Sequence, residues 1–244
     1  MRLLHPALAL FYLAQAGVLL FLSASYSVGV TGTYLAKDTL QSMVHDKTVF
    51  APASEHLFDI SLRWLVVVLL LVMALTHIVL TVLSRRQGNE RTDGARRLHW
   101  AGIGVSGAFV AVLLALTIGL RDITLLVSLI GLTSLVSVAG FLLETRQQMP
   151  RRALYTLAGI AALTPWIVLA VGIIMGAEQG SLSAWLQWLF VVPACWALLL
   201  YAGVYQLYAG RRPLKLEATI FISLVIFGMY SCLAWQTYAA LLHV

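Results

Sequence analysis

The chain has 244 residues, of which 61% are hydrophobic and 11% are charged, and its formal net charge is +6 at pH 7. Ordinary soluble domains have about 25% charged residues, so this composition excludes a soluble protein and indicates a polytopic membrane protein. Spanning helices of about 20 residues would use most of the chain, so we expect a single transmembrane domain over residues 1–244. The basic residues are scattered over short connections, which argues against nucleic-acid binding.

Apolar runs bounded by charged residues predict seven membrane-spanning helices. In chain order they cover residues 6–25, 58–84, 98–120, 123–143, 153–176, 184–209 and 218–242. The expected fold is therefore an all-α membrane protein, a seven-helix bundle with its termini on opposite sides. Most of the 16 Lys and Arg residues fall on one set of connections. The positive-inside rule then places the N-terminus in the cytoplasm and the C-terminus outside, and we expect the plasma membrane.

The connection between the first two spans, residues 26–57, is the longest and is expected outside the cell. A structureless loop of this length is unusual and is often a functional lid. Its segments Gly32–Leu35 and Thr48–Phe50 are rich in β-branched and aromatic residues. We expect them to form a short β-hairpin that lies over the mouth of the bundle.

No carboxylate and no lysine falls near the middle of a predicted span. The three lysines are Lys37 and Lys47 in the outer loop and Lys215 at the inner end of the seventh span. Proton pumps and ion-coupled transporters usually need an intramembrane acid, so the sequence favours neither. We expect no catalytic residues and no enzymatic activity.

His77 is the one titratable side chain predicted well inside a span. It is either a neutral histidine hydrogen-bonded to a neighbouring helix or part of a site. A single histidine is poor support for a metal or haem site, and we expect no metal. The remaining histidines are expected to be interfacial or solvated, and they are His5, His45, His56, His99 and His243.

The segment Gly102–Gly107 matches the pattern G-x-G-x-x-G, but it opens a membrane span and follows no strand. It therefore fails the structural context of a dinucleotide site, and its small residues instead permit close helix contact or leave space in the bundle. Several aromatic residues could line a flat apolar pocket or simply pack between helices. These are Trp166, Trp196, Tyr201, Phe227, Tyr230 and Trp235.

Short strings spread in order along the chain resemble the heliorhodopsins, which also combine seven helices, an inside N-terminus and a long outer first loop. The strings are Gly32–Leu35, Ala74–His77, Trp100, Leu120–Ile123, Leu143–Glu144, Pro165–Ile167, Ser223–Val225 and Ser231–Gln236. The resemblance implies a rhodopsin-like seven-helix bundle, a retinal site between the helices and a homodimer.

The sequence departs from heliorhodopsins at the residues that carry their retinal chemistry. The retinal lysine position becomes Tyr230 when the chain is aligned on Leu233–Gln236, or Phe227 when it is aligned on Ser223–Val225. The counterion glutamate of the third helix becomes Gly102, and a first-helix histidine becomes Tyr12. Losing the cation and its counterion together avoids an unpaired buried charge.

We therefore expect a heliorhodopsin-like protein that forms no retinal Schiff base and acts as a binding or regulatory module. Its pocket is empty, filled by its own side chains, or occupied by an apolar ligand such as a lipid, retinal or a carotenoid. The residues expected around this vestigial retinal site are His77, Gly102, Ser106, Trp166, Trp196, Phe227, Met229 and Tyr230.

Two alternatives stay open, a photoreceptor with non-covalent retinal or carotenoid and an intramembrane enzyme or transporter. The expected partners are the bilayer, a second copy of the chain and an unknown membrane or cytoplasmic protein. Small residues in the fourth span offer a candidate dimer face, and they are Gly131, Ser134, Ser137 and Gly140.

Overall fold

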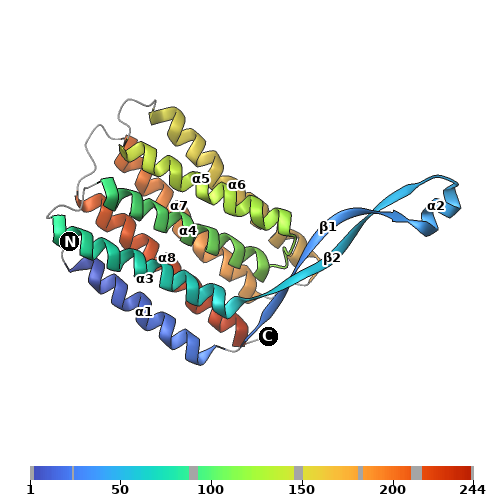
Figure 1. Cartoon of the computed structure of the whole chain (residues 1–244), viewed down its shortest axis with the longest axis horizontal. Helices are drawn as coiled ribbons and strands as arrows, with labels where there is room; N and C mark the ends of the chain where they lie inside the picture. The colour runs from blue at the N-terminus through green and yellow to red at the C-terminus, as the bar shows by residue number, and fades with distance from the viewer. Residues whose placement is uncertain are drawn as a thin grey trace.

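A computed structural model describes residues 3–23, 25–87, 93–145, 151–180, 184–209 and 216–242. Within these ranges seven long helices lie side by side in one bundle (Figure 1), and each is long and apolar enough to cross a membrane. They are α1 Leu4–Leu22, α3 Leu62–Gln87, α4 Asp93–Thr117, α5 Ile123–Thr145, α6 Arg151–Glu178, α7 Ala184–Ala209 and α8 Leu216–Leu242. The predicted all-α, seven-helix membrane fold is confirmed.

Several helix ends differ from the predicted spans. The helix α4 starts at Asp93, five residues before the predicted position 98, and both helices beside the first connection also differ. The helix α1 ends at Leu22, because Ser23 is extended and its hydroxyl donates to the Leu19 carbonyl. The helix α3 starts at Leu62, four residues later than expected, because the residues up to Ser61 belong to a strand. The basic connections 88–92, 146–150 and 210–215, including Lys215, lie outside the described residues.

The first connection forms a β-hairpin with a short helix at its tip. The strands β1 Ser27–Asp38 and β2 Val49–Ser61 pair antiparallel along their whole length, and α2 Thr39–His45 joins them. The predicted hairpin is confirmed, but its expected length and position are wrong. Pairing from Ser27↔Ser61 to Asp38↔Val49, with one register shift between Val30 and Thr31, makes it long. It projects away from the bundle instead of covering the mouth (Figure 1).

The base of the hairpin is fixed to the connection between α4 and α5. The Thr31 amide donates to the Arg121 carbonyl at 2.9 Å, and the Thr33 amide donates to Asp122 Oδ2 at 3.1 Å. The Thr33 hydroxyl donates to the same oxygen, while Asp122 Oδ1 accepts from the Thr124 and Leu125 amides at the start of α5. Two of the strings that resemble heliorhodopsins are thereby joined by one carboxylate.

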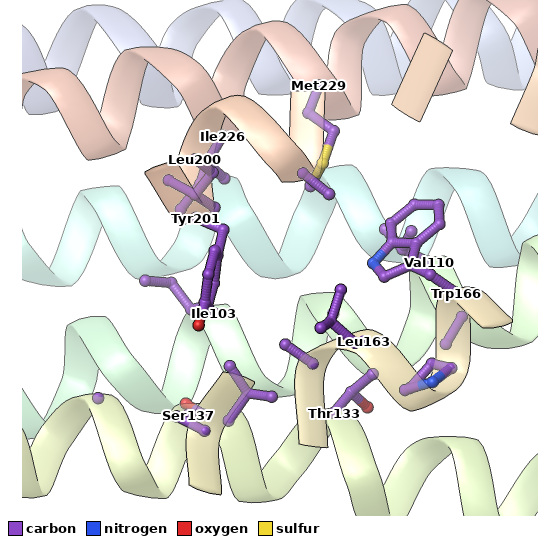
Figure 2. A pocket seen from close by; sticks show the side chains of 18 of the residues that line it. Ile103, Val110, Thr133, Ser137, Leu163, Trp166, Leu200, Tyr201, Ile226 and Met229 are labelled. Atoms are coloured by element: carbon purple, nitrogen blue, oxygen red, sulfur yellow. The ribbon is translucent and has the colours of Figure 1, made fainter. Parts of the chain in front are cut away.

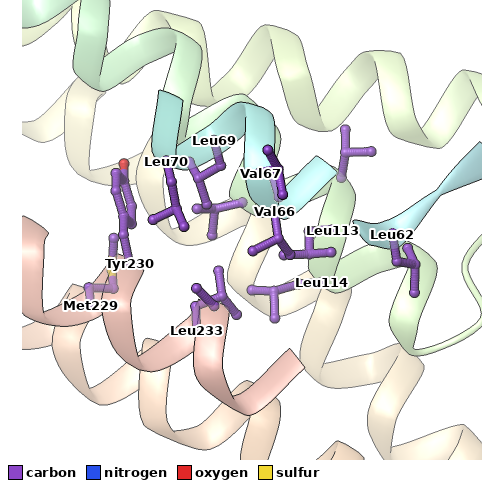
Figure 3. Close-up of a cluster of buried hydrophobic side chains, with 14 of the residues drawn as sticks. Leu62, Val66, Val67, Leu69, Leu70, Leu113, Leu114, Met229, Tyr230 and Leu233 are labelled. Carbon is purple, nitrogen blue, oxygen red and sulfur yellow. The ribbon is translucent and has the colours of Figure 1, made fainter. Parts of the chain in front are cut away.

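Helices that follow one another along the chain are mostly neighbours in the bundle. The helix α1 packs against α3 and α8, the helices α3 to α6 pack in order, and α7 packs against α8. Fully buried leucines of α3, α4 and α8 fill the space between these helices (Figure 3), and they are Leu69, Leu70, Leu113, Leu114 and Leu233. The exception is the pair α6 and α7, which make little backbone contact with each other.

Candidate functional site

A cavity of about 310 Å³ lies between α4, α5, α6, α7 and α8 (Figure 2). Its lining is mostly apolar, and along α6 the lining residues run from Tyr155 to Leu169. That segment corresponds to about 21 Å of helix rise, so the cavity is elongated along the helices. Small-molecule pockets begin at about 300 Å³, so the space suits one small apolar molecule.

One wall of the cavity carries a hydrogen-bonded pair of neutral hydroxyls. The Tyr230 Oη of α8 lies 2.8 Å from the Ser106 Oγ of α4, and the two side chains are 1% and 0% exposed. The Ser106 hydroxyl donates to the Ile103 carbonyl at 3.1 Å, so its oxygen accepts from Tyr230. Both polar groups are satisfied without any charge, which is the least costly way to bury them.

Three of the eight residues expected around the vestigial retinal site line the cavity, namely Trp166, Met229 and Tyr230. Ser106 contacts the cavity wall through its bond to Tyr230. Among the other aromatic candidates Tyr201 also lines the cavity. The sequence thus identified residues on α4, α6, α7 and α8, from four of the five helices that enclose the space.

Gly102 lies one helical turn from Ser106 but faces α3. A Cβ atom at position 102 would come within 2.6 Å of Thr76 Cγ2 and Oγ1. The Thr76 hydroxyl donates to the Val72 carbonyl of its own helix at 2.8 Å. Gly102 therefore allows close contact between α4 and α3, and it does not line the cavity.

Phe227 and Trp196 do not line the cavity and instead pack against neighbouring helices. The Phe227 ring meets the Tyr12 ring of α1 edge-on, with centroids 5.2 Å apart. The Trp196 indole packs on Gly228 of α8, where a Cβ would come within 2.7 Å of the ring. Trp235 packs against Tyr238 and is partly exposed. Of the two candidate lysine positions on α8, Tyr230 therefore lines the cavity, while Phe227 approaches α1.

His77 pairs with another histidine instead of standing alone. Its Nδ1 lies 3.0 Å from Nδ1 of His5, and the two side chains are 1% and 4% exposed. His5 was expected to be interfacial or solvated, and its side chain is not solvated, because α1 turns this residue toward α3. In the sequence both histidines lie toward the same end of adjacent spans. That placement is compatible with a contact but does not identify one.

The histidine pair belongs to a polar region between α1 and α3, apart from the cavity. The Tyr12 ring stacks on His77 with centroids 5.8 Å apart. Within the described residues, Tyr12 Oη and His77 Nε2 are buried without a hydrogen-bond partner, and ordered water usually satisfies such atoms. The described residues contain no group of three metal-type ligands.

Aromatic side chains bridge the wide space between α6 and α7. The Tyr155 hydroxyl donates to the Tyr201 carbonyl at 3.2 Å, and the two rings are 5.1 Å apart. Closer to the hairpin end of the bundle, the rings of Trp166 and Phe190 are 5.5 Å apart. The two helices are therefore held together by side chains at two levels.

Between these two levels the cavity comes close to the outer surface of the bundle. Leu163 of α6 and Leu198 of α7 both line the cavity and are 46% and 60% exposed. Apolar side chains exposed on a membrane bundle face lipid. Leucine side chains that line the cavity thus also face the bilayer between α6 and α7.

The small residues of α5 do not share one outward face. The Ser137 hydroxyl donates to the Trp100 carbonyl of α4, and the Trp100 ring lies directly on Gly140. Gly131 instead faces open space. Trp100 and Ser137 line the cavity, and the sequence did not single them out as pocket residues, because their role depends on how α4 and α5 are rotated.

The model of the heliorhodopsin family matches residues 1–242 of the chain. The match therefore extends over all seven helices and the hairpin. No curated protein matches the chain.

Proposed function

The chain belongs to the heliorhodopsin family, and we propose that it is a membrane module that binds an apolar ligand non-covalently and forms no Schiff base. The observation that carries this proposal is the apolar cavity of about 310 Å³, whose wall holds the neutral Tyr230–Ser106 pair. Heliorhodopsins are light-sensing rhodopsins that normally bind retinal. The proposed ligand occupies the corresponding space between the helices without a covalent bond.

The distribution of lysines supports the absence of a Schiff base. An imine with retinal requires an amine beside the ligand. Lys37 lies in β1 and Lys47 between α2 and β2, both outside the bundle, and the seven apolar spans of the described residues contain no lysine.

The position of the cavity supports a ligand that arrives from the bilayer. The cavity is lined mostly by apolar groups, and two of its lining leucines, Leu163 of α6 and Leu198 of α7, are also exposed on the lipid-facing surface. An apolar molecule dissolved in the membrane would pass between two leucines without meeting water. A regulatory role would then need a membrane or cytoplasmic protein that responds to occupancy of the cavity.

Titration of the purified protein with all-trans-retinal tests the proposal. We expect a saturable change in the retinal absorption band and no retinal adduct after borohydride reduction. Ala197→Phe, which fills the cavity, should abolish the change, and the matched Ala202→Phe on the exposed side of α7 should preserve it. A stable lysine adduct would overturn the proposal, as would equal responses from the two variants. A structured visible band would favour the photoreceptor form of the proposal.

We further propose that the N-terminus is cytoplasmic and that the protein resides in the plasma membrane. In the sequence, most Lys and Arg residues fall near the N-terminus and on or beside the connections after the second, fourth and sixth spans, whereas the hairpin follows the first span. This is the pattern of a cytoplasmic N-terminus. The hairpin should then be cleaved by protease added outside intact cells. Cleavage only in inverted vesicles would reverse the orientation.

A homodimer is also proposed, because family membership implies it and the hairpin leaves strand edges unpaired. A two-stranded ribbon with strands of 12 and 13 residues exposes one edge on each strand, and such edges tend to be covered by other chains. Native mass spectrometry in mild detergent should show a dimer. A purely monomeric spectrum would contradict this proposal.

A further inference from the structure

Two hydrogen-bond donors in the cavity lining have no protein partner. Within the described residues, neither the Tyr201 hydroxyl nor the Trp166 indole N–H donates a hydrogen bond, although both side chains line the cavity. A donor left without an acceptor in an apolar site loses the stabilisation of its hydrogen bond. These two donors are therefore available to a ligand.

The other hydroxyls of the lining are already engaged. Thr133 donates to the Leu129 carbonyl at 2.9 Å, Ser137 to Trp100, Tyr155 to Tyr201, and Tyr230 to Ser106. Packing inside a protein normally satisfies such groups. The exceptions, Tyr201 and Trp166, are consequently the positions at which this cavity can discriminate between ligands.

The Tyr201 side chain is held in place with its hydroxyl across the cavity. Tyr155 packs on its ring, and Gly159 leaves the room that its hydroxyl uses, because any Cβ there would collide with Oη. Figure 2 shows the ring extending from the α7 side toward Ile103 and Ser137, with Trp166 farther along the cavity. A fixed donor binds an acceptor without first losing side-chain freedom.

We propose that the cavity selects a flat apolar ligand that carries a carbonyl-type oxygen, with Tyr201 as the main donor and Trp166 as a second donor. This inference rests on the proposed function and adds the chemical class of its ligand. An apolar cavity of about 150 Å³ holds benzene, so a space of about 310 Å³ can hold a fused bicyclic ring. Aromatic walls formed by Trp100, Trp166 and Tyr201 suit a flat ring.

A matched pair of probes tests the selection, namely 2,3-dimethyl-1,4-naphthoquinone and 2,3-dimethylnaphthalene. They share a carbon skeleton and differ in the two carbonyl oxygens, and the methyl groups block thiol addition to the quinone. Equilibrium dialysis against the protein in nanodiscs gives a dissociation constant for each probe. The ratio of the two constants, compared between wild type and variant, cancels the partition of each probe into lipid.

The wild-type preference for the quinone should fall by about 2- to 12-fold in Tyr201→Phe, which corresponds to one neutral hydrogen bond. Trp166→Phe should produce a smaller fall. The control Tyr238→Phe removes a hydroxyl of α8 outside the cavity and should leave the ratio unchanged. If the ratio is the same in wild type and in the Tyr201 and Trp166 variants, the inference is overturned.

The infrared carbonyl band of the bound quinone provides a measurement that needs no variant. Relative to the band of the unbound quinone, it should shift to lower wavenumber in the wild-type protein, because hydrogen bonding weakens the C=O bond. An unshifted band from bound quinone would overturn the inference while leaving the proposed function intact. Absence of saturable binding by both probes would instead count against the proposed function itself.

Discussion

Tyr230→Lys combined with Ser106→Asp should return a cation and a carboxylate to the cavity wall. The two hydroxyl oxygens now lie 2.8 Å apart, and a lysine ammonium reaches about as far from the backbone as a tyrosine hydroxyl. The amine and carboxylate should therefore meet across α8 and α4. The amine would then lie beside the cavity, where retinal can form an imine with it.

The expected changes in stability follow from the burial of positions 230 and 106. A single lysine near the bilayer centre costs about 2.5 to 3.5 kcal/mol, and the lost hydroxyl pair adds about 1 kcal/mol. Tyr230→Lys alone should therefore destabilise the protein by about 4 kcal/mol. Contacting pairs show coupling of about 0.5 to 3 kcal/mol, so Ser106→Asp should restore part of this loss.

The assay combines thermal unfolding in detergent with retinal absorption and borohydride reduction. The double variant should form a reducible adduct on residue 230 and absorb in the visible, because the carboxylate stabilises a protonated imine. Tyr230→Lys alone should give an unprotonated, near-ultraviolet imine or fail to fold.

Two further pairs serve as controls for the geometry. Phe227→Lys with Ser106→Asp should give no pigment, because Phe227 points to Tyr12 of α1. Tyr230→Lys with Gly102→Glu should be less stable than the Ser106→Asp pair, because a Cβ at position 102 meets Thr76. Pigment from the Phe227 pair but not from the Tyr230 and Ser106 pair would refute the assignment of the lysine position.

Two other predictions concern the hairpin and the packing of the cavity wall. Asp122→Asn should accelerate hydrogen exchange at the Thr33 amide, which donates to this carboxylate. Hydrogen bonds from the Thr124 and Thr33 hydroxyls lower the pKa of Asp122. The stability that the ionised Asp122 carboxylate gives to this contact is therefore complete above the ordinary carboxyl pKa of about 3.9, and it is lost as pH falls toward the lowered pKa. The protection of the Thr33 amide against hydrogen exchange should thus not depend on the titration of Asp122 between about pH 5 and 8. Protection of this amide that titrates in that range would contradict the prediction. Gly140→Ala should lower the free energy of unfolding by about 1 to 3 kcal/mol because the Trp100 ring occupies the space, whereas Gly131→Ala faces open space and should be neutral in the same thermal assay.

Chain length and hydropathy were enough to predict the seven helices, and strand-forming composition predicted a hairpin in the first connection. Each span needs about 20 apolar residues regardless of its neighbours, so the spans could be located one at a time. The hairpin was underestimated because only Gly32–Leu35 and Thr48–Phe50 have obvious strand composition. Its full length depends on cross-strand pairing and on the Asp122 contact, and neither can be read from one strand alone.

The direction in which individual side chains point was much harder to predict. In a soluble helix the apolar stripe marks the buried side, but in a membrane both the lipid-facing and the core-facing sides are apolar. Trp166 and Tyr230 line the cavity, whereas Trp196 packs on α8 and Phe227 on α1, outside the lining. Composition does not separate these two groups of residues. The pairing of His5 with His77 was missed for the same reason, since it depends on the rotation of α1 against α3.

The polar groups around the cavity explain why a neutral ligand is the consistent choice. A buried charge needs an opposite charge beside it, and none of the seven described spans places a lysine or a carboxylate in the cavity lining. Tyr230 and Ser106 satisfy each other as neutral hydroxyls, so they attract neither an anion nor a cation. Tyr201 offers a neutral donor, which binds an uncharged oxygen without requiring a counterion. A ligand that is apolar except for such an oxygen therefore meets every requirement that these residues impose.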